Sequence, residues 1–339
     1  MVDKQNILLR SRILGKLPSF VGRVEFDRVG FCYKESSQYC QMFAVNPVGG
    51  AADIPMARHG KWTYFACGDC RTMELCPVPT ELELQRYYNS EYSVPCTEAH
   101  YQHYESISRK LLASIGTYTP VLGTLLEIGC SHGAFLLQAR AAGWDVTGIE
   151  ISEEASTNAR TLGLKVLTGT LEQNASSLGM FDCIVAWHVI EHIVDVHRFF
   201  ETVKPHLKPG GLLALRTPNA RALSARTIPQ YWQWIGAPAH VRLFSAAGME
   251  MLLRRHGFTV LCQSTRRGDN RAFGTDLLMA LAKAVLDRKR TDVDEEMMKG
   301  NGSRAGNVPK YTDLVFRPVD WLLGINGRNM LGAELFVLA

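Results

Sequence analysis

The sequence predicts an α/β protein built on a doubly wound, mostly parallel sheet. Within residues 96–265, short apolar runs alternate with amphipathic stretches that have helical spacing. The run at 181–186 is mostly apolar and does not alternate with polar residues, which is typical of a strand buried on both faces. Strands that alternate with helices connect in parallel, so these observations predict helices on both faces of one sheet.

Local sequence features support each predicted element. The first strand, residues 124–128, is followed by a glycine-containing turn and a helix at 134–142 that Gly143 ends. A strand at 146–149 precedes a helix that Ser152 caps, with two glutamates in its first turn, where the helix dipole favours negative charge. The remaining predicted strands cover residues 165–167, 181–186, 212–216 and 258–262, and the remaining helices cover residues 196–206 and 249–256.

Composition divides the 339-residue chain into three regions. Residues 1–95 are irregular and rich in Cys, Pro, Gly and aromatic residues, and residues 96–265 hold the α/β pattern. Residues 266–339 hold a helix-like stretch at 274–290, a polar tract at 291–310 with an expected mobile loop at 299–307, and a final apolar strand. With 46% hydrophobic and 21% charged residues, the composition excludes a disordered, collagen-like or coiled-coil chain.

Charge and cysteine content indicate the kind of partner and compartment. The chain has 37 Lys and Arg against 33 Asp and Glu, a net charge of +4, and its basic residues form only short clusters, so no nucleic-acid partner is expected. Apolar runs stop well short of the roughly 20 residues of a membrane span, and the N-terminus lacks the apolar segment of a signal peptide. Nine scattered cysteines fit reduced thiols and predict a cytoplasmic protein.

Two motifs together predict a ligand that contains a nucleoside. LLEIGCSHG (125–133) places Glu127, Gly129 and Gly133 between a strand and a helix, where glycines let a ligand approach the backbone and helix N–H groups lack partners. GWDVTGIE (143–150) ends a strand on Glu150, 23 residues after Glu127, where an acid accepts the two hydroxyls of a ribose. Taken alone, the first motif could be a tight turn and the second a solvated acid. Because the two occur together at this spacing, they favour a ligand that contains a nucleoside.

These residues resemble the class I S-adenosylmethionine-dependent methyltransferases. LLEIGCSHG is similar to the first motif of that family, with Ser131 where a third glycine is common, and FDCIVAWHVIEHIVD (181–195) and KPGGLLALRTPN (208–219) are similar to its fourth- and fifth-strand motifs. Thr170 stands where the family usually has an Asp near the adenine. The resemblance implies a Rossmann-like, seven-stranded sheet whose last strand, residues 332–338, lies antiparallel beside the fifth. It also implies S-adenosyl-L-methionine as the cofactor, held by Glu127, Gly129, Cys130, Ser131, Gly133, Glu150, Ile151, Thr170, Leu171, Trp187 and His188.

Candidate catalytic residues follow from the chemistry that this resemblance implies. Methyl transfer to a hydroxyl needs a group that accepts the hydroxyl proton. His188, Glu191, His192 and His240 are all expected at the carboxyl end of the sheet, where open α/β folds bind ligands. We favour His240 as the base, because Glu191 and His192 have a ready structural role at a helix start.

The string H-x-x-E-H formed by His188, Glu191 and His192 has two further interpretations. It matches a zinc-peptidase signature, which its place directly after a strand of a nucleotide-binding sheet excludes. Its spacing also resembles the E-x-x-E-H of ubiquinone-pathway O-methyltransferases and small-RNA 2′-O-methyltransferases, which are metal-assisted, and His240 could approach the same pocket. The alternative is that Glu191 and His192 cap and orient the helix that follows.

Aromatic residues between 227 and 244 predict an acceptor site. Tyr231, Trp232, Trp234 and Phe244 surround His240 in a segment that covers the active site in related methyltransferases. They are expected to form a lid that binds the substrate. An aromatic core cluster beneath a long loop is the alternative.

The N-terminal region contains a C-x-x-C knuckle of the kind found in zinc ribbons, formed by Cys67 and Cys70. Residues 64–92 resemble the cysteine-rich front end of one group of class I methyltransferases, although the first C-x-x-C of that group is missing here. Either Cys67 and Cys70 hold a structural zinc ion within an irregular ligand set, or the ribbon has lost its metal.

Three functions remain open from the sequence. The leading hypothesis is methyl transfer to a hydroxyl of a small-molecule or glycan biosynthetic intermediate. The second is metal-assisted RNA 2′-O-methylation, which the modest net charge disfavours. The third is a non-catalytic protein that uses the cofactor fold for interaction.

Overall fold

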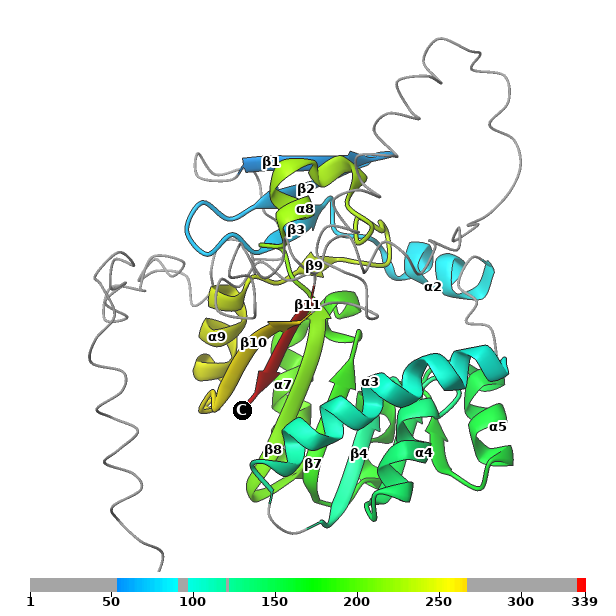
Figure 1. Ribbon diagram of the computed structural model, residues 1–339. Coiled ribbons are helices and arrows are strands. Elements are labelled where there is room, and N and C mark those ends of the chain that lie inside the picture. Colours follow the sequence, from blue (N-terminus) through cyan, green and yellow to red (C-terminus); the bar gives the residue numbers. More distant parts are fainter. Residues whose placement is uncertain (1–53, 91–96, 120–121, 267–333) are drawn as a thin grey trace, which may run out of the picture.

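The computed structural model describes residues 54–90, 97–119, 122–266 and 334–339 (Figure 1). Its strands are β1 (Ile54–His59), β2 (Trp62–Ala66), β3 (Met73–Cys76), β4 (Thr124–Ile128), β5 (Asp145–Glu150), β6 (Lys165–Thr168), β7 (Phe181–Trp187), β8 (Leu207–Pro218), β9 (Arg242–Leu243), β10 (Cys262–Arg266) and β11 (Glu334–Leu338). Its α-helices are α2 (Glu81–Ser90), α3 (Glu98–Gly116), α4 (Ala134–Ala141), α5 (Glu153–Thr161), α6 (Leu171–Asn174), α7 (Val196–Val203), α8 (Leu223–Thr227) and α9 (Ala246–Arg255). None of the helices in these ranges is long and apolar enough to cross a membrane.

The larger sheet has seven strands in the order β10-β11-β8-β7-β4-β5-β6. The pairs from β6 to β8 are parallel, whereas β11 runs antiparallel to both of its neighbours, β8 and β10. This arrangement confirms the predicted doubly wound, mostly parallel sheet and the predicted place of the last strand. Because β11 pairs in the register Glu334↔Pro218, it brings Glu334 to the carboxyl end of β8.

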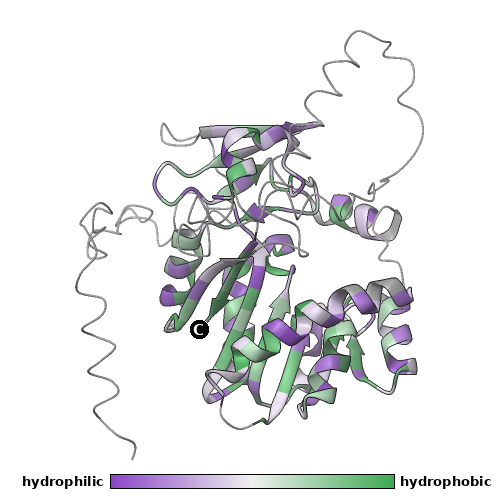
Figure 2. Ribbon diagram, viewed as in Figure 1, coloured by the Kyte–Doolittle hydropathy of each residue, from purple (hydrophilic) through white to green (hydrophobic). Residues whose placement is uncertain are grey.

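Two hydrophobic cores cover the two faces of this sheet. One contains residues of α3, α4 and α5, among them Leu111, Leu136 and Ala159, packed against one face. The other contains residues of α7 and α9, among them Phe199 and Leu252, packed against the opposite face. Figure 2 shows that the central strands are largely hydrophobic, while the covering helices also carry hydrophilic residues. The result is a three-layer α/β/α structure whose strand ends remain accessible for a site.

The described part of the N-terminal region forms strands of a second, antiparallel sheet, which the sequence pattern did not predict. Its order is β1-β2-β3-β9, so three N-terminal strands are completed by a short strand from the 242–243 segment of the core. Tyr64, Leu75 and Trp232 belong to its hydrophobic core. Alternation between apolar and polar residues is short here, and the sheet depends on a partner strand far away in sequence, which explains why local pattern did not predict it.

Two predicted elements are shifted in the structure. The predicted strand at 258–262 is instead β10 at Cys262–Arg266, because Phe258 and Val260 pack against the core from the connection before that strand. The predicted turn at Pro209 and Gly210 lies inside the longer strand β8. The predicted helix at 274–290 and loop at 299–307 lie outside the described residues.

Candidate active site

A cavity of about 490 Å³ lies where β4, β5 and β7 end. It is lined by all the cofactor-binding residues that the sequence predicted except Gly133. Of the predicted catalytic residues, His188, Glu191, His192 and His240 all line it as well. The structure therefore brings the two predicted groups together in one site.

The turn after β4 is fixed against β5. The backbone N–H groups of Gly129 and Cys130 both donate to the carbonyl of Ile149, at 2.8 and 3.0 Å. Gly129 has φ +72°, and a Cβ there would lie 2.5 Å from Val189, so only glycine fits this position without strain. Ser131 has φ +48°, which is uncommon for a residue with a side chain. The residues of this turn thus line the cavity.

Glu150 joins two loops at the end of β5. Its Oε2 accepts the N–H of Ser131 at 2.7 Å, and its Oε1 accepts the N–H of Ser152 at 2.9 Å. Each carboxylate oxygen has a second lone pair, so both can still accept a hydroxyl from a ligand in the cavity. Glu150, the acid predicted to bind a ribose, is therefore held by two backbone hydrogen bonds and lines the cavity.

Glu127 provides a second acidic group on the cavity wall. It is 3% exposed, and its Oε2 has no hydrogen-bond partner among the residues that the structure describes. Burial, and then the charge of Glu150, raise the pKa of Glu127 well above its usual value. A buried carboxyl oxygen that lacks a donor is well suited to a cationic group such as a ligand ammonium, which would also restore the charged form.

Thr170 has a structural role that the sequence did not reveal. Its hydroxyl accepts the N–H of Gln173 at 3.2 Å, and its own N–H donates to the Gln173 side chain at 2.8 Å. This reciprocal pair caps α6. Thr170 lines the cavity, but its hydroxyl and its N–H are both already used in the cap.

Gly133 lies away from the cavity wall because it serves helix packing. A Cβ at this position would lie 2.4 Å from Leu164 and 3.3 Å from Ala159, and its φ is +82°. We therefore expect Gly133→Val to destabilise the fold by about 2–5 kcal/mol, the sum of overpacking and left-handed strain.

Thermal denaturation checks this expectation for Gly133. Gly179→Val is the matched control, because a Cβ at Gly179 meets nothing within 4 Å. If the variant kept the parental melting temperature but lost cofactor binding, Gly133 would instead be assigned to the cofactor site.

His188 forms a buried network with two acids. Its Nδ1 lies 3.1 Å from Glu191 and its Nε2 lies 3.0 Å from Glu334, which is also paired with Arg216. Burial alone would lower the pKa of His188, but its hydrogen bonds to Glu191 and Glu334 raise it to about 9. The ring is therefore an imidazolium at neutral pH, and it stacks on Trp234 with 4.9 Å between ring centroids. While both ring nitrogens donate to carboxylates, His188 has no free lone pair in this arrangement.

His192 and His240 are held in the opposite protonation state. The Nδ1 of His192 lies 3.0 Å from the carbonyl of Ala239, and the Nδ1 of His240 lies 2.8 Å from the carbonyl of Trp234. A carbonyl oxygen only accepts, so each Nδ1 carries the hydrogen and each Nε2 keeps a lone pair. Burial lowers the pKa of His192 to about 4 and also lowers that of His240. Both rings are neutral near pH 7.

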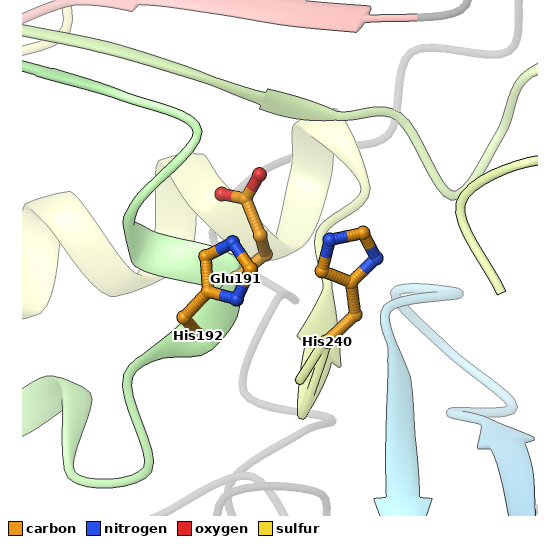
Figure 3. Close-up of side chains that lie close together, drawn as sticks. All are labelled: Glu191, His192 and His240. Carbon is orange, nitrogen blue, oxygen red and sulfur yellow. The ribbon is translucent and has the colours of Figure 1, made fainter. Parts of the chain in front are cut away.

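Glu191, His192 and His240 form the group in the described part of the chain that could hold a metal ion. One ligand atom from each lies within 4.8 Å of the others. Figure 3 shows the two histidine rings approaching one another from separate segments, with Glu191 beside them. The sequence predicted His188, Glu191 and His192 for such a set, with His240 able to approach the same pocket; the three that come together in the structure are Glu191, His192 and His240.

The predicted zinc knuckle lies in the turn between β2 and β3. Cys67 and Cys70 are both buried there, and neither belongs to a group of three potential ligands among the described residues. Cys32 and Cys40 lie outside the described residues. Zinc binding at Cys67 and Cys70 stays a prediction.

The aromatic segment divides between the cavity and the core. Trp234 lines the cavity, whereas Trp232 and Phe244 are at most 2% exposed and pack in two different hydrophobic cores. Tyr231 is half-buried and does not line the cavity. Trp234 and His240 are therefore the residues of this segment that line the cavity, and a lid over the acceptor stays a prediction.

Several cavity residues were not predicted from the sequence. Tyr87 and Tyr88 from α2 and Tyr104 from α3 form a wall, and the Tyr88 hydroxyl lies 3.0 Å from Nδ1 of His192. Adjacent tyrosines in an amphipathic helix were a visible aromatic signal. Arg216 and Glu334 had no local signal, because only the pairing of β8 with β11 brings them together.

Comparison with known proteins agrees with this fold. A family model described as "Methyltransferase domain" matches residues 99–263. The ubiquinone biosynthesis O-methyltransferase of Caulobacter vibrioides is 34% identical over 128 residues, 34% of this chain and 51% of that protein. The one of Rhizobium leguminosarum is 32% identical over 126 residues, 34% of this chain and 50% of that protein. The chain spans about half the length of these curated relatives.

A solved structure, a SAM-dependent methyltransferase of Archaeoglobus fulgidus, matches with a TM-score of 0.45 and 18% identity, over 76% of this chain and 98% of that one. The family match covers the segment that supplies β4, β5 and β7 and most of the cavity wall. The chain therefore contains a class I S-adenosylmethionine-dependent methyltransferase domain.

Proposed function

We propose that the protein methylates a hydroxyl of a small-molecule or glycan biosynthetic intermediate, with His240 as the general base. The observation that carries this proposal is the lone pair on Nε2 of His240 in the cavity that also contains Glu127 and Glu150. The relatives named ubiquinone biosynthesis O-methyltransferases support an oxygen acceptor on a small molecule.

The residues at the strand ends fit S-adenosylmethionine. Glu150 would accept hydrogen bonds from the ribose hydroxyls, and Oε2 of Glu127, which has no partner among the described residues, would accept a hydrogen bond from the methionyl ammonium. When bound, the cofactor supplies a methyl group activated by a sulfonium. The protein then contributes by orienting the acceptor and by removing its proton.

Two of the histidines could accept the proton of the acceptor hydroxyl. His240 and His192 are neutral and keep Nε2 lone pairs, whereas His188 is held as a cation by Glu191 and Glu334. We favour His240 because His192 already has a structural role in the short 3-10 helix, Ile190–His192, that follows β7. Tyr87, Tyr88 and Trp234 would enclose the acceptor between aromatic surfaces.

The test of this function is a screen for the product. Purified protein is incubated with S-adenosylmethionine and sets of candidate hydroxyl-containing metabolites, and the products are analysed by mass. We expect a gain of one methyl group on a hydroxyl, together with formation of the demethylated cofactor. Binding of neither cofactor form in calorimetry would favour the non-catalytic interpretation instead.

A metal-assisted reaction is the second candidate, and the cluster of Glu191, His192 and His240 favours it. A carboxylate and two neutral imidazoles are a ligand set that zinc and iron accept. In that case the ion would lower the pKa of the acceptor hydroxyl, and His192 and His240 would be its ligands instead of bases.

Chelation separates these alternatives and also tests the knuckle. Our leading proposal expects chelated protein to keep its turnover. Loss of turnover at an unchanged melting temperature, restored by adding back the ion, would assign a metal to Glu191, His192 and His240. A lower melting temperature with release of about one zinc ion per chain would assign structural zinc to Cys67 and Cys70, since structural zinc binding is coupled to folding.

A further inference from the structure

One buried tyrosine of the N-terminal sheet contacts the backbone of His240, the candidate base. Tyr64 on β2 is fully buried, and its hydroxyl donates to the backbone carbonyl of His240 at 2.7 Å. The same hydroxyl accepts a backbone hydrogen bond from Gly236. Burial raises the pKa of Tyr64, so the hydroxyl keeps the proton that it donates. Tyr64 therefore contacts both ends of the turn that carries His240.

The same turn also holds the imidazole of His240 in place. The N–H of His240 donates to the carbonyl of Gly236 at 2.9 Å, and its ring Nδ1 donates to the carbonyl of Trp234 at 2.8 Å. A Cβ on Gly236 would lie 3.1 Å from that Nδ1, so the ring packs closely against the backbone of its own turn. The direction of Nε2 consequently follows the position of the turn.

The neighbouring strand β3 holds the residues that follow. The N–H of Leu75 donates to the carbonyl of Val241, and the N–H of Val241 donates to the carbonyl of Glu191, both at 2.9 Å. A buried ion pair between Glu74 and Arg242 lies beside these bonds. The N-terminal sheet is thus hydrogen-bonded to the segment that supplies His240, and that segment is hydrogen-bonded to the one that supplies Glu191 and His192.

We propose that Tyr64 is a positioning residue, by which the N-terminal sheet sets the backbone of His240 and so aims its Nε2 at the acceptor hydroxyl. The inference rests on the proposed function, because it needs His240 to be the base. It assigns the N-terminal sheet a part in the reaction as well as in stability. Removal of the Tyr64 hydroxyl should then slow the chemical step more than it weakens binding of either ligand.

Tyr64→Phe tests this, because it removes the hydroxyl and keeps the buried ring. We expect kcat to fall by roughly 10–10²-fold, as for a small displacement of a catalytic group, with little change in KM, cofactor affinity or melting temperature. Tyr118→Phe is the matched control, because Tyr118 is exposed and does not line the cavity. Unchanged kcat would overturn the inference, and so would parallel losses of kcat, cofactor affinity and melting temperature, which indicate a purely structural role.

A double-mutant cycle with His240→Ala distinguishes this inference from the proposed function. If Tyr64 acts through His240, Tyr64→Phe should have no further effect on turnover once His240 is replaced. An equal further loss in that background would overturn the inference. If His240→Ala loses turnover and Tyr64→Phe does not, only the role of Tyr64 is wrong; if His240→Ala keeps turnover, the base assignment itself fails.

Discussion

Replacing Glu150 by alanine should abolish detectable binding of S-adenosylmethionine while the protein remains folded. The carboxylate is predicted to accept two ribose hydroxyls, and each charge-assisted hydrogen bond is worth about 1.5–3 kcal/mol. Together these losses correspond to a roughly 10²–10⁴-fold weaker affinity. The structure adds a reason for a large effect, because the same carboxylate holds the N–H groups of Ser131 and Ser152. Calorimetry measures the affinity.

Glu154→Ala is the matched control for this experiment. Glu154 is an exposed acid in the first turn of α5 and does not line the cavity. This substitution removes one negative charge close to Glu150, so a long-range effect of the lost charge is the same in both variants. Parental affinity in Glu150→Ala would show that the ribose assignment is wrong, and a lost near-ultraviolet circular dichroism signal would show that the fold had failed instead.

Replacing His240 by alanine should cut turnover by roughly 10²–10⁴-fold, the usual contribution of a general base. Cofactor affinity should stay near the parental value, because the base contacts the acceptor. Burial lowers the pKa of His240 below 6.5, although the charge of Glu191 acts in the opposite direction. A base is active when neutral, so the rate should fall as the pH drops through a value below 6.5, and this acidic limb should disappear in the variant.

Rate–pH profiles of three variants complete the test of the base. His59→Ala is the control for general loss of a histidine, because His59 is exposed on β1. If His192→Ala loses turnover and His240→Ala does not, the proton acceptor is His192. If neither variant loses turnover, the acceptor needs no base, as for an amine or a stabilised carbanion, and the hydroxyl assignment is wrong.

Most residues of the predicted cofactor half of the cavity could be named from the sequence, because they lie within short, continuous motifs. The turn at Gly129 and the acid at Glu150 each follow a strand whose pattern is visible locally. Parallel strands place such turns at the same edge, so the meeting of the two motifs follows from the fold class. The seven-stranded sheet was predictable for the same reason, since strand–helix alternation restricts the connections to a few topologies.

The acceptor half depends on contacts between distant segments, and no local pattern encodes them. No local pattern showed the protonation states of the three candidate histidines, yet two acids make His188 a cation while backbone carbonyls leave His192 and His240 as neutral rings. One of those acids, Glu334, comes from the last strand. The protonation state of an imidazole is set by burial and by neighbouring charges within a few ångströms, so only the tertiary structure could decide which rings are neutral.

The aromatic residues show the same division. The sequence determined that rings cluster around His240, but packing decided that Trp232 belongs to the core of the N-terminal sheet and that Trp234 faces the cavity. It also brought Tyr64 to the backbone of His240 across 176 residues. A sequence therefore determines local turns, caps and strand patterns through short-range backbone preferences, whereas which side chains face one another is decided only when distant strands pair and bury their surfaces.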